Sequence, residues 1–184
     1  MATTKKGMTT RDLVLTGILL AAGTVIKAVF PKLPVTPNFI ISMYCLAVLL
    51  VRPRIVETIG IGVVSAILAQ LTTGAAVPFI NFASEPIAIV VCYFLCRISF
   101  PKGAPSTIIR PAVVSFITTF VSGTVFVLIL SFVLLARGSA ARYVMIYTVV
   151  LPTAVANMVI TTICYAPLRR VLNIKDEEPA KAAA

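Results

Sequence analysis

An acidic residue within an apolar stretch is the first candidate for chemistry in this chain. Glu85 lies in the segment Pro78-Phe79-Ile80-Asn81-Phe82-Ala83-Ser84-Glu85-Pro86, a polar, proline-containing break between two long apolar runs. A charged carboxylate at the centre of a membrane helix costs about 2.5–3.5 kcal/mol, so such a residue marks a functional site by default. We interpret the segment as one wall of a small-molecule site.

The second charged candidate is Lys27, near the end of the first apolar run. A cation and an anion at similar depth suit a zwitterion, with Lys27 meeting a carboxylate and Glu85 an ammonium. A few polar groups among aromatic side chains are typical of a small-molecule pocket. The expected substrate-binding residues are Lys27, Asn38, Gln70, Asn81, Glu85, Tyr147 and Asn157, with Phe39, Phe79, Phe82 and Tyr143 at similar depth.

Each of these residues also has a structural interpretation, and the sequence leaves both open. Lys27 could extend its ammonium to the lipid headgroups. Glu85, between Ser84 and Pro86, could mark the start of a helix, where an acid complements the helix dipole. Lys27 and Glu85 could also pair only with each other, and Asn157 could join helices instead of binding a ligand.

Several reaction classes are excluded by what the sequence lacks. The chain contains no histidine, so histidine-based catalytic triads and metal sites are excluded. It has no G-x-x-x-x-G-K-[ST] segment, and Glu85 has no second carboxylate at its depth. Cys92 and Cys96 are one helical turn apart, but without histidine they are more typical of packing than of a metal pair. We expect no enzyme, no cofactor and no metal.

The composition indicates an integral membrane protein. Of 184 residues 59% are hydrophobic, and the mean hydropathy is +1.05. A spanning helix needs about 20 residues, so six spans fit. The apolar runs cover residues 13–30, 38–51, 55–71, 85–98, 111–135 and 143–165. We predict an all-α bundle of six transmembrane helices in a single domain, residues 1–170, followed by a charged, disordered cytoplasmic tail, residues 171–184.

The basic residues set the expected orientation. The net charge is +10, and 12 of the 16 Lys and Arg residues fall on one side of the predicted spans. By the positive-inside rule this side is cytoplasmic, so both termini are expected there. Glu85 then faces outward, together with the proline-rich loop 31–37. This placement at span ends also argues against a nucleic-acid partner.

The chain resembles the substrate-binding S component of energy-coupling factor (ECF) transporters. The similarity rests on six spans in under 200 residues, cytoplasmic termini, a small-residue stripe in the first span and no ATPase motif. Two segments, Pro37-Asn38-Phe39-Ile40-Ile41-Ser42-Met43 and Pro78-Phe79-Ile80-Asn81, are similar to the tryptophan-transporter-like branch. The resemblance covers about Thr10 to Arg170.

This resemblance implies a mechanism. An S component binds its substrate with high affinity at an outward-facing site, docks on a transmembrane coupling subunit with two ATPase subunits, and topples in the membrane of a prokaryotic cell to release substrate inside. The docking stripe here would be Gly17 and Ala21, with Gly17 where the family has an alanine. The loop 31–37 would be a lid. The expected substrate is tryptophan or a related amino acid, and for tryptophan aromatic residues would stack on the indole.

Three alternatives stay open at this point. An S component for a vitamin, such as a thiamine- or riboflavin-like compound, would accept similar aromatic and polar walls. A stand-alone secondary transporter would normally carry an ionisable relay or inverted repeats, and we find no convincing similarity between the first and last three spans. A non-transport assembly subunit would need no ligand site.

Overall fold

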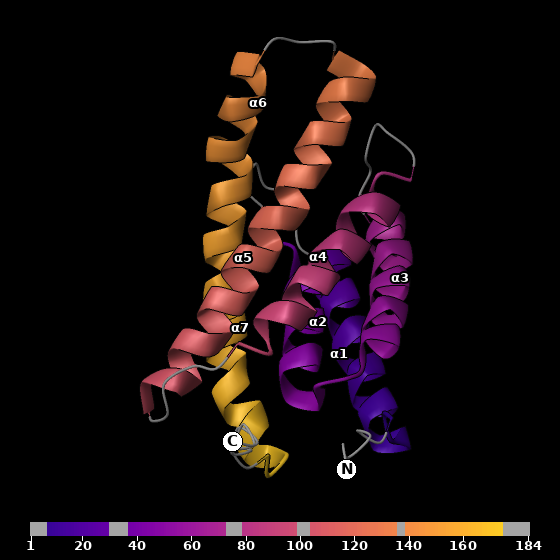
Figure 1. The fold of residues 1–184 in the computed structure, drawn as a ribbon, viewed down its shortest axis with the longest axis vertical. Helices are drawn as coiled ribbons and strands as arrows, with labels where there is room; N and C mark the ends of the chain where they lie inside the picture. The colour runs from indigo at the N-terminus through magenta and orange to yellow at the C-terminus, as the bar shows by residue number, and fades with distance from the viewer. Residues whose placement is uncertain (1–6, 30–36, 73–78, 99–103, 136–138, 175–184) are drawn as a thin grey trace, which may run out of the picture.

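Helices make up the ordered elements of the part of the chain that the structure describes. The computed structural model describes residues 7–29, 37–72, 79–98, 104–135 and 139–174. The helices are α1 (Thr10–Val29), α2 (Phe39–Val51), α3 (Ile55–Thr72), α4 (Asn81–Leu95), α5 (Ala104–Leu130), α6 (Ser139–Met145) and α7 (Leu151–Val171). A π-helical segment, η1 (Ser131–Leu135), continues α5, and a second, η2 (Ile146–Val150), joins α6 to α7. These residues therefore form six continuous helical rods (Figure 1).

Four of the six rods are long and apolar enough to cross a membrane. They include residues Thr10–Val29, Ile55–Thr72, Thr107–Val133 and Ala141–Val171. The other two, α2 and α4, have 13 and 15 residues. At 1.5 Å per residue they are about 20 and 22 Å long, against about 30 Å of hydrocarbon. The prediction of an all-helical bundle is confirmed. Of the six predicted spans, four correspond to helices long enough to cross a membrane.

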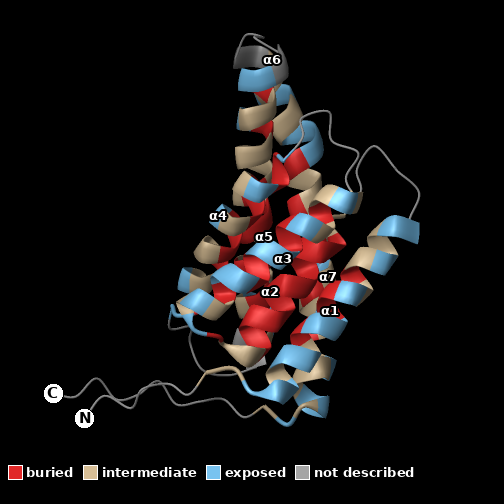
Figure 2. Ribbon diagram, turned by 90° about the vertical axis from the view of Figure 1, so that its right-hand side faces the viewer, coloured by how far each residue is buried: buried red, intermediate tan, exposed pale blue. Residues whose placement is uncertain are grey.

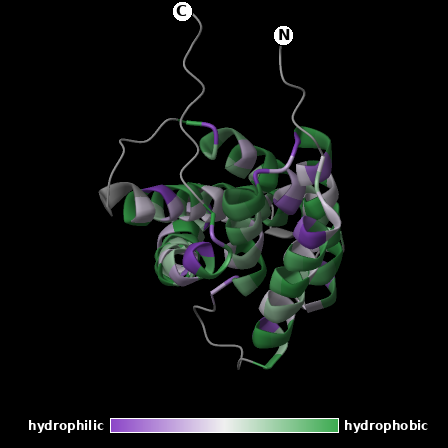
Figure 3. Ribbon diagram, turned by 90° about the horizontal axis from the view of Figure 1, so that it is seen from below, coloured by the Kyte–Doolittle hydropathy of each residue, from purple (hydrophilic) through white to green (hydrophobic). Residues whose placement is uncertain are grey.

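The short helix α2 forms the centre of the bundle. Its sequence is apolar on every side, as expected of a helix with neighbours all around it. It contacts α1, α3, α4, α5 and α7, and 12 of its 13 residues are buried (Figure 2). The outward faces of the surrounding helices are largely hydrophobic (Figure 3), with exposed residues such as Leu13, Val63 and Phe94. Both the interior of the bundle and its outer surface are therefore hydrophobic, as expected of a bundle surrounded by lipid.

The start of α1 and the end of α7 lie at the same end of the bundle (Figure 1). This arrangement agrees with the prediction that both termini are on one side. Most of the predicted tail, residues 175–184, lies outside the described residues. So does the predicted lid loop, apart from Pro37.

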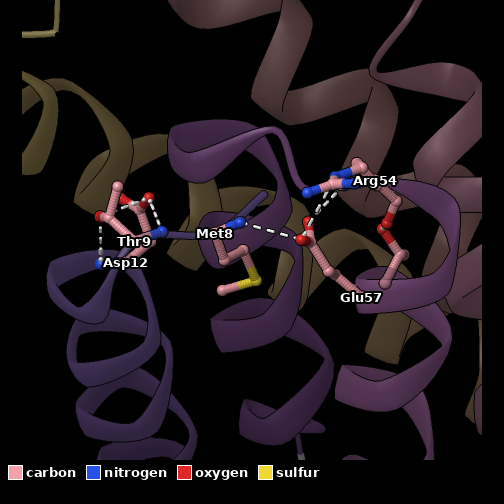
Figure 4. Close-up of polar contacts among 6 residues, drawn as sticks. Met8, Thr9, Asp12, Arg54 and Glu57 are labelled. Atoms are coloured by element: carbon pink, nitrogen blue, oxygen red, sulfur yellow. Dashed lines mark hydrogen bonds and ion pairs between the residues drawn. The ribbon is translucent and has the colours of Figure 1, made fainter. Parts of the chain in front are cut away.

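Two acids at this end of the bundle cap helices (Figure 4). Asp12 Oδ2 accepts hydrogen bonds from Thr9 N at 2.9 Å and Thr9 Oγ1 at 2.8 Å, which caps α1. Glu57 accepts from Arg54 N at 2.7 Å, at the start of α3, and from Met8 N at 2.8 Å. The Glu57 carboxylate therefore joins the residues before α1 to the start of α3.

Two helices begin earlier than the sequence predicted. The fourth run was expected to start at Glu85, but α4 starts at Asn81, after a turn in which Phe82 N donates to Phe79 O at 2.9 Å. Pro86 lies inside α4, and Pro111 lies inside α5. A proline near a helix start removes only one backbone bond, so it was wrongly read as a boundary.

The predicted runs 111–135 and 143–165 imply a connection that lasts to residue 142, but the structure is helical before that point. Residues from Ser139 onward are helical and belong to α6. At the other end of this rod, α7 continues past Pro167 to Val171. The rods formed by α5 with η1 and by α6, η2 and α7 therefore reach beyond the other helices (Figure 1).

Candidate functional site

Glu85 is completely enclosed by the bundle. It lies on the buried face of α4 with Asn81, Ser84 and Ala88, at the i, i+3 and i+4 spacing of one helix face. Its side chain is 1% exposed. One carboxylate oxygen, Oε1, accepts hydrogen bonds from Asn38 Nδ2 at 3.5 Å and Ser122 Oγ at 3.4 Å. The other, Oε2, has no hydrogen-bond partner.

This acid differs from the other two in the described residues. Asp12 and Glu57 cap helix ends, where a carboxylate is satisfied by backbone N–H groups. Glu85 lies in the second turn of α4, and the hydrogen bonds to it come from the side chains of α2 and α5 neighbours. A buried carboxylate oxygen that accepts no hydrogen bond lowers the stability of the fold. Such a group is expected where a function requires it. The helix-start interpretation of Glu85 is therefore not supported by the geometry.

Asn38 and Asn157 extend this polar group to α7. Asn157 is 0% exposed. Its Nδ2 donates to the backbone oxygen of Asn38 at 3.2 Å and to Thr119 Oγ1 at 3.1 Å. We call Asn38, Glu85, Thr119, Ser122 and Asn157 the Glu85 cluster. It joins α2, α4, α5 and α7 at the end where α2 and α4 begin.

Lys27 and Tyr44 adjoin the cluster. Lys27, in the last turn of α1, interacts electrostatically with Glu85. Tyr44, from the central helix α2, is fully buried and lies against Glu85. The structure therefore brings together four of the expected substrate-binding residues: Lys27, Asn38, Glu85 and Asn157.

Gln70 and Asn81 form a separate pair. Asn81 Nδ2 donates to Gln70 Oε1 at 3.0 Å and so connects the end of α3 to the start of α4. Asn81 is on the same buried face as Glu85, one turn earlier. The pair is one turn of α4 away from Glu85 and does not share the hydrogen bonds of the Glu85 cluster.

Tyr147 is not brought into the cluster. Its side chain, on η2, is 67% exposed. The pair Phe79 and Phe82, with ring centroids 6.0 Å apart, is also largely exposed, as is Tyr143. Of the aromatic residues expected at this depth, Phe39 is the one that the structure buries, next to Asn38.

The expected docking residues lie on the outer surface of α1. Gly17 and Ala21 are exposed, and a Cβ atom built on Gly17 meets nothing within 4 Å. Gly23, by contrast, faces α2, where a Cβ would lie 2.9 Å from the backbone oxygen of Phe39. The first span therefore uses Gly23 for packing within the bundle and leaves Gly17 and Ala21 facing out of it.

Ser122, Thr119 and Tyr44 are not among the site residues predicted from the sequence. The signal for two of them was the run of hydroxyl and small residues in α5, in which Ser115, Thr119 and Gly123 are four apart. In the structure Ser115 Oγ lies 2.9 Å from Thr161 Oγ1, so this stripe forms the polar contact between α5 and α7.

Two sulfur atoms meet elsewhere in the core, where Cys92 Sγ lies 3.9 Å from Cys45 Sγ. Both cysteines are buried among apolar side chains. Within the described residues no group of three or more His, Cys, Asp or Glu side chains is placed to hold a metal ion.

Comparison with known proteins identifies a family that the chain matches. The family model described as "Tryptophan transporter TrpP" matches residues 9–173. The chain is 30% identical over 172 residues to a "Probable tryptophan transport protein" of Bacillus subtilis (strain 168), which covers 90% of this chain and 94% of that protein. No solved structure matches the chain significantly. The resemblance seen in the sequence is therefore confirmed.

Proposed function

Because the chain belongs to the tryptophan transporter family TrpP, we propose that it is the tryptophan-binding S component of an ATP-driven ECF importer. Membership in this family, together with four membrane-length apolar helices, makes it a multi-pass membrane protein. It is a transporter and not an enzyme. The substrate-binding role, the ECF partners and the prokaryotic cell membrane are the proposed part.

The observation that carries the proposal is that the positive charge of Lys27 acts on the buried carboxylate of Glu85. Glu85 has an unused carboxylate oxygen, and Lys27 interacts with the same carboxylate. An amino acid zwitterion can replace this mutual interaction, its ammonium meeting Glu85 and its carboxylate meeting Lys27. Tyr44, which lies against Glu85, and Phe39, which follows Asn38 in the chain, are buried aromatic side chains that would pack on an indole.

The short helices α2 and α4 support an outward-facing site. Both begin at the end opposite the start of α1, and both are shorter than a membrane span. Asn38 and Glu85 therefore lie below the tips of the longer helices. A helix that begins inside the membrane leaves room above it for a ligand, as in transporters with discontinuous helices. Gln70 and Asn81 would form the upper edge of this site.

Energy for uptake would come from partner subunits. The sequence has no P-loop, so ATP hydrolysis would be carried out by two ATPase subunits bound to a transmembrane coupling subunit. The exposed Gly17 and Ala21 on α1 offer a small-residue surface on which another helix can approach closely. Binding outside, docking and toppling would then deliver tryptophan to the cytoplasm.

A ligand screen by thermal unfolding tests the substrate. Purified protein in detergent is heated with each of the twenty amino acids and with thiamine or riboflavin. A ligand at a thousandfold excess over its Kd stabilises the folded state by about 4 kcal/mol. We expect stabilisation by L-tryptophan. A shift with a vitamin alone would contradict the proposed substrate, and no shift with any compound would contradict a substrate-binding role.

An uptake assay tests the need for partners. We expect proteoliposomes that contain only this chain to bind tryptophan without accumulating it. Accumulation driven by an ion gradient, without ATPase subunits, would show a stand-alone secondary transporter.

A further inference from the structure

Three oxygen atoms of the Glu85 cluster are buried and receive no hydrogen bond. They are Asn38 Oδ1, Glu85 Oε2 and Asn157 Oδ1. Buried polar atoms in native structures nearly always have a partner, and an acceptor without a donor is destabilising. Three such atoms on residues that are joined by hydrogen bonds therefore indicate a missing set of donors.

The orientation of both amides follows from their partners. The backbone oxygen of Asn38 can only accept, so the group of Asn157 that faces it must be Nδ2, and Oδ1 points the other way. In the same way the amide nitrogen of Asn38 faces the Glu85 carboxylate. The three open atoms are therefore acceptors, and they call for N–H or O–H donors.

Several buried hydroxyl groups of the protein are also without a hydrogen-bond partner, among them those of Ser42, Tyr44 and Ser84. The Tyr44 hydroxyl lies against Glu85, so its O–H can turn toward the carboxylate. The two amide oxygens, Asn38 Oδ1 and Asn157 Oδ1, receive no hydrogen bond from any of these hydroxyl groups. The positive charge of Lys27 also acts on the Glu85 carboxylate.

We propose that Asn38 Oδ1, Glu85 Oε2 and Asn157 Oδ1 together form a subsite for a primary ammonium group. A primary ammonium carries three N–H donors and one positive charge, which matches two neutral acceptors and one carboxylate. The proposal rests on the proposed function, and assigns the α-ammonium of the substrate to these three atoms. The site then selects against amines with fewer N–H groups and not only for positive charge.

Tryptophan derivatives methylated on the amine test the subsite with the unaltered protein. Binding to the purified full chain is measured by calorimetry for L-tryptophan and its Nα-methyl, Nα,Nα-dimethyl and Nα,Nα,Nα-trimethyl derivatives. The trimethyl compound keeps the charge and has no N–H. We expect each lost N–H to weaken binding about tenfold, as for a hydrogen bond to a charged group. α-Methyltryptophan, which adds one methyl and keeps all three N–H groups, is expected to lose less than the Nα-methyl compound.

Two variants locate the effect. In Glu85→Gln, we expect the preference for tryptophan over the trimethyl compound to shrink, because a charged acceptor is removed. In Ser84→Ala, which changes a buried neighbour on the same helix, the preference should stay. If neither variant folds, the ligand series decides.

The outcomes separate this inference from the proposed function. Equal binding of tryptophan and its trimethyl derivative would overturn the ammonium subsite and leave tryptophan binding intact. Equal losses for α-methyltryptophan and Nα-methyltryptophan would also overturn it, because size alone would then explain the result. No binding of tryptophan at all would overturn the proposed function, and the subsite with it.

Discussion

Asn157 donates its side-chain amide to the backbone oxygen of Asn38 at 3.2 Å, across 119 residues of sequence. The bond joins the last helix to the residue before the central helix α2. The Asn38 oxygen also accepts from Ile41 N at 2.9 Å, as a helix start requires. Asn157 therefore fixes where α2 begins, and with it the position of the Asn38 side chain beside Glu85.

We expect Asn157→Ala to lower the free energy of unfolding by about 1–2 kcal/mol, because two buried hydrogen bonds are lost. The measurement is the unfolding midpoint in detergent without ligand. Thr162→Ala is the matched control, since Thr162 also lies in α7 and its hydroxyl donates to Met158 O of its own helix at 2.7 Å. Equal destabilisation by the two variants would contradict a structural role of the Asn157–Asn38 bond.

The two glycines of α1 predict opposite results. In Gly23→Ala the new Cβ would lie 2.8 Å from Met43 Cγ and 2.9 Å from the Phe39 oxygen, and the latter cannot turn away. Overpacking of this kind typically costs about 1–3 kcal/mol. In Gly17→Ala the Cβ meets nothing within 4 Å, so stability should be unchanged or slightly higher. Thermal unfolding of both variants checks this, and a stable Gly23→Ala protein would contradict the α1–α2 contact.

A bulky residue at Gly17 tests the proposed docking surface. We expect Gly17→Leu to keep tryptophan binding and to lose uptake in cells that contain the coupling and ATPase subunits, because the helices can no longer approach closely. Gly60→Leu is the control, since Gly60 is also exposed on a helix, α3, with nothing within 4 Å of its Cβ. Normal uptake by Gly17→Leu would show that another surface docks.

Glu57 is expected to affect stability and not binding. In Glu57→Gln the charge that accepts from Met8 N and Arg54 N is removed (Figure 4), which should lower the free energy of unfolding by about 1 kcal/mol. Its contacts lie at the opposite end of the bundle from the Glu85 cluster, so tryptophan affinity should not change. Calorimetry on both proteins gives the answer, and weaker binding would show that the two ends are coupled.

Hydropathy was sufficient to predict the all-helical bundle, because long apolar runs must satisfy their backbone groups within helices. The predicted runs 38–51 and 85–98 were already short, but we expected a full span from each, whereas α2 and α4 have 13 and 15 residues. Hydropathy did not predict the start of α4 either, because Pro86 was taken as a boundary, whereas a turn at Phe79 and Ile80 leads into the helix at Asn81. Length and proline position alone do not reveal which helices are enclosed by others.

The sequence predicts those residues of the candidate site whose side chains are costly to bury in a membrane unless they have a function. Glu85 stands out in an apolar sequence for this reason. Ser122 and Thr119 do not, because hydroxyl groups in membrane helices commonly bond to their own backbone, as Ser65 does to Ile61 O at 2.8 Å. Tyr147 was grouped by depth, but it lies in a π-helical segment, which changes the face that a 3.6-residue period assigns.

The most direct test of the central claim is the affinity of the purified protein for L-tryptophan before and after removal of each charge. Glu85→Gln and Lys27→Met each leave a side chain of similar length. We expect saturable binding by the unaltered protein and binding at least about tenfold weaker in each variant, since each loses a charge-assisted contact. Unchanged affinity in both variants would contradict the assignment of Glu85 and Lys27 to the substrate.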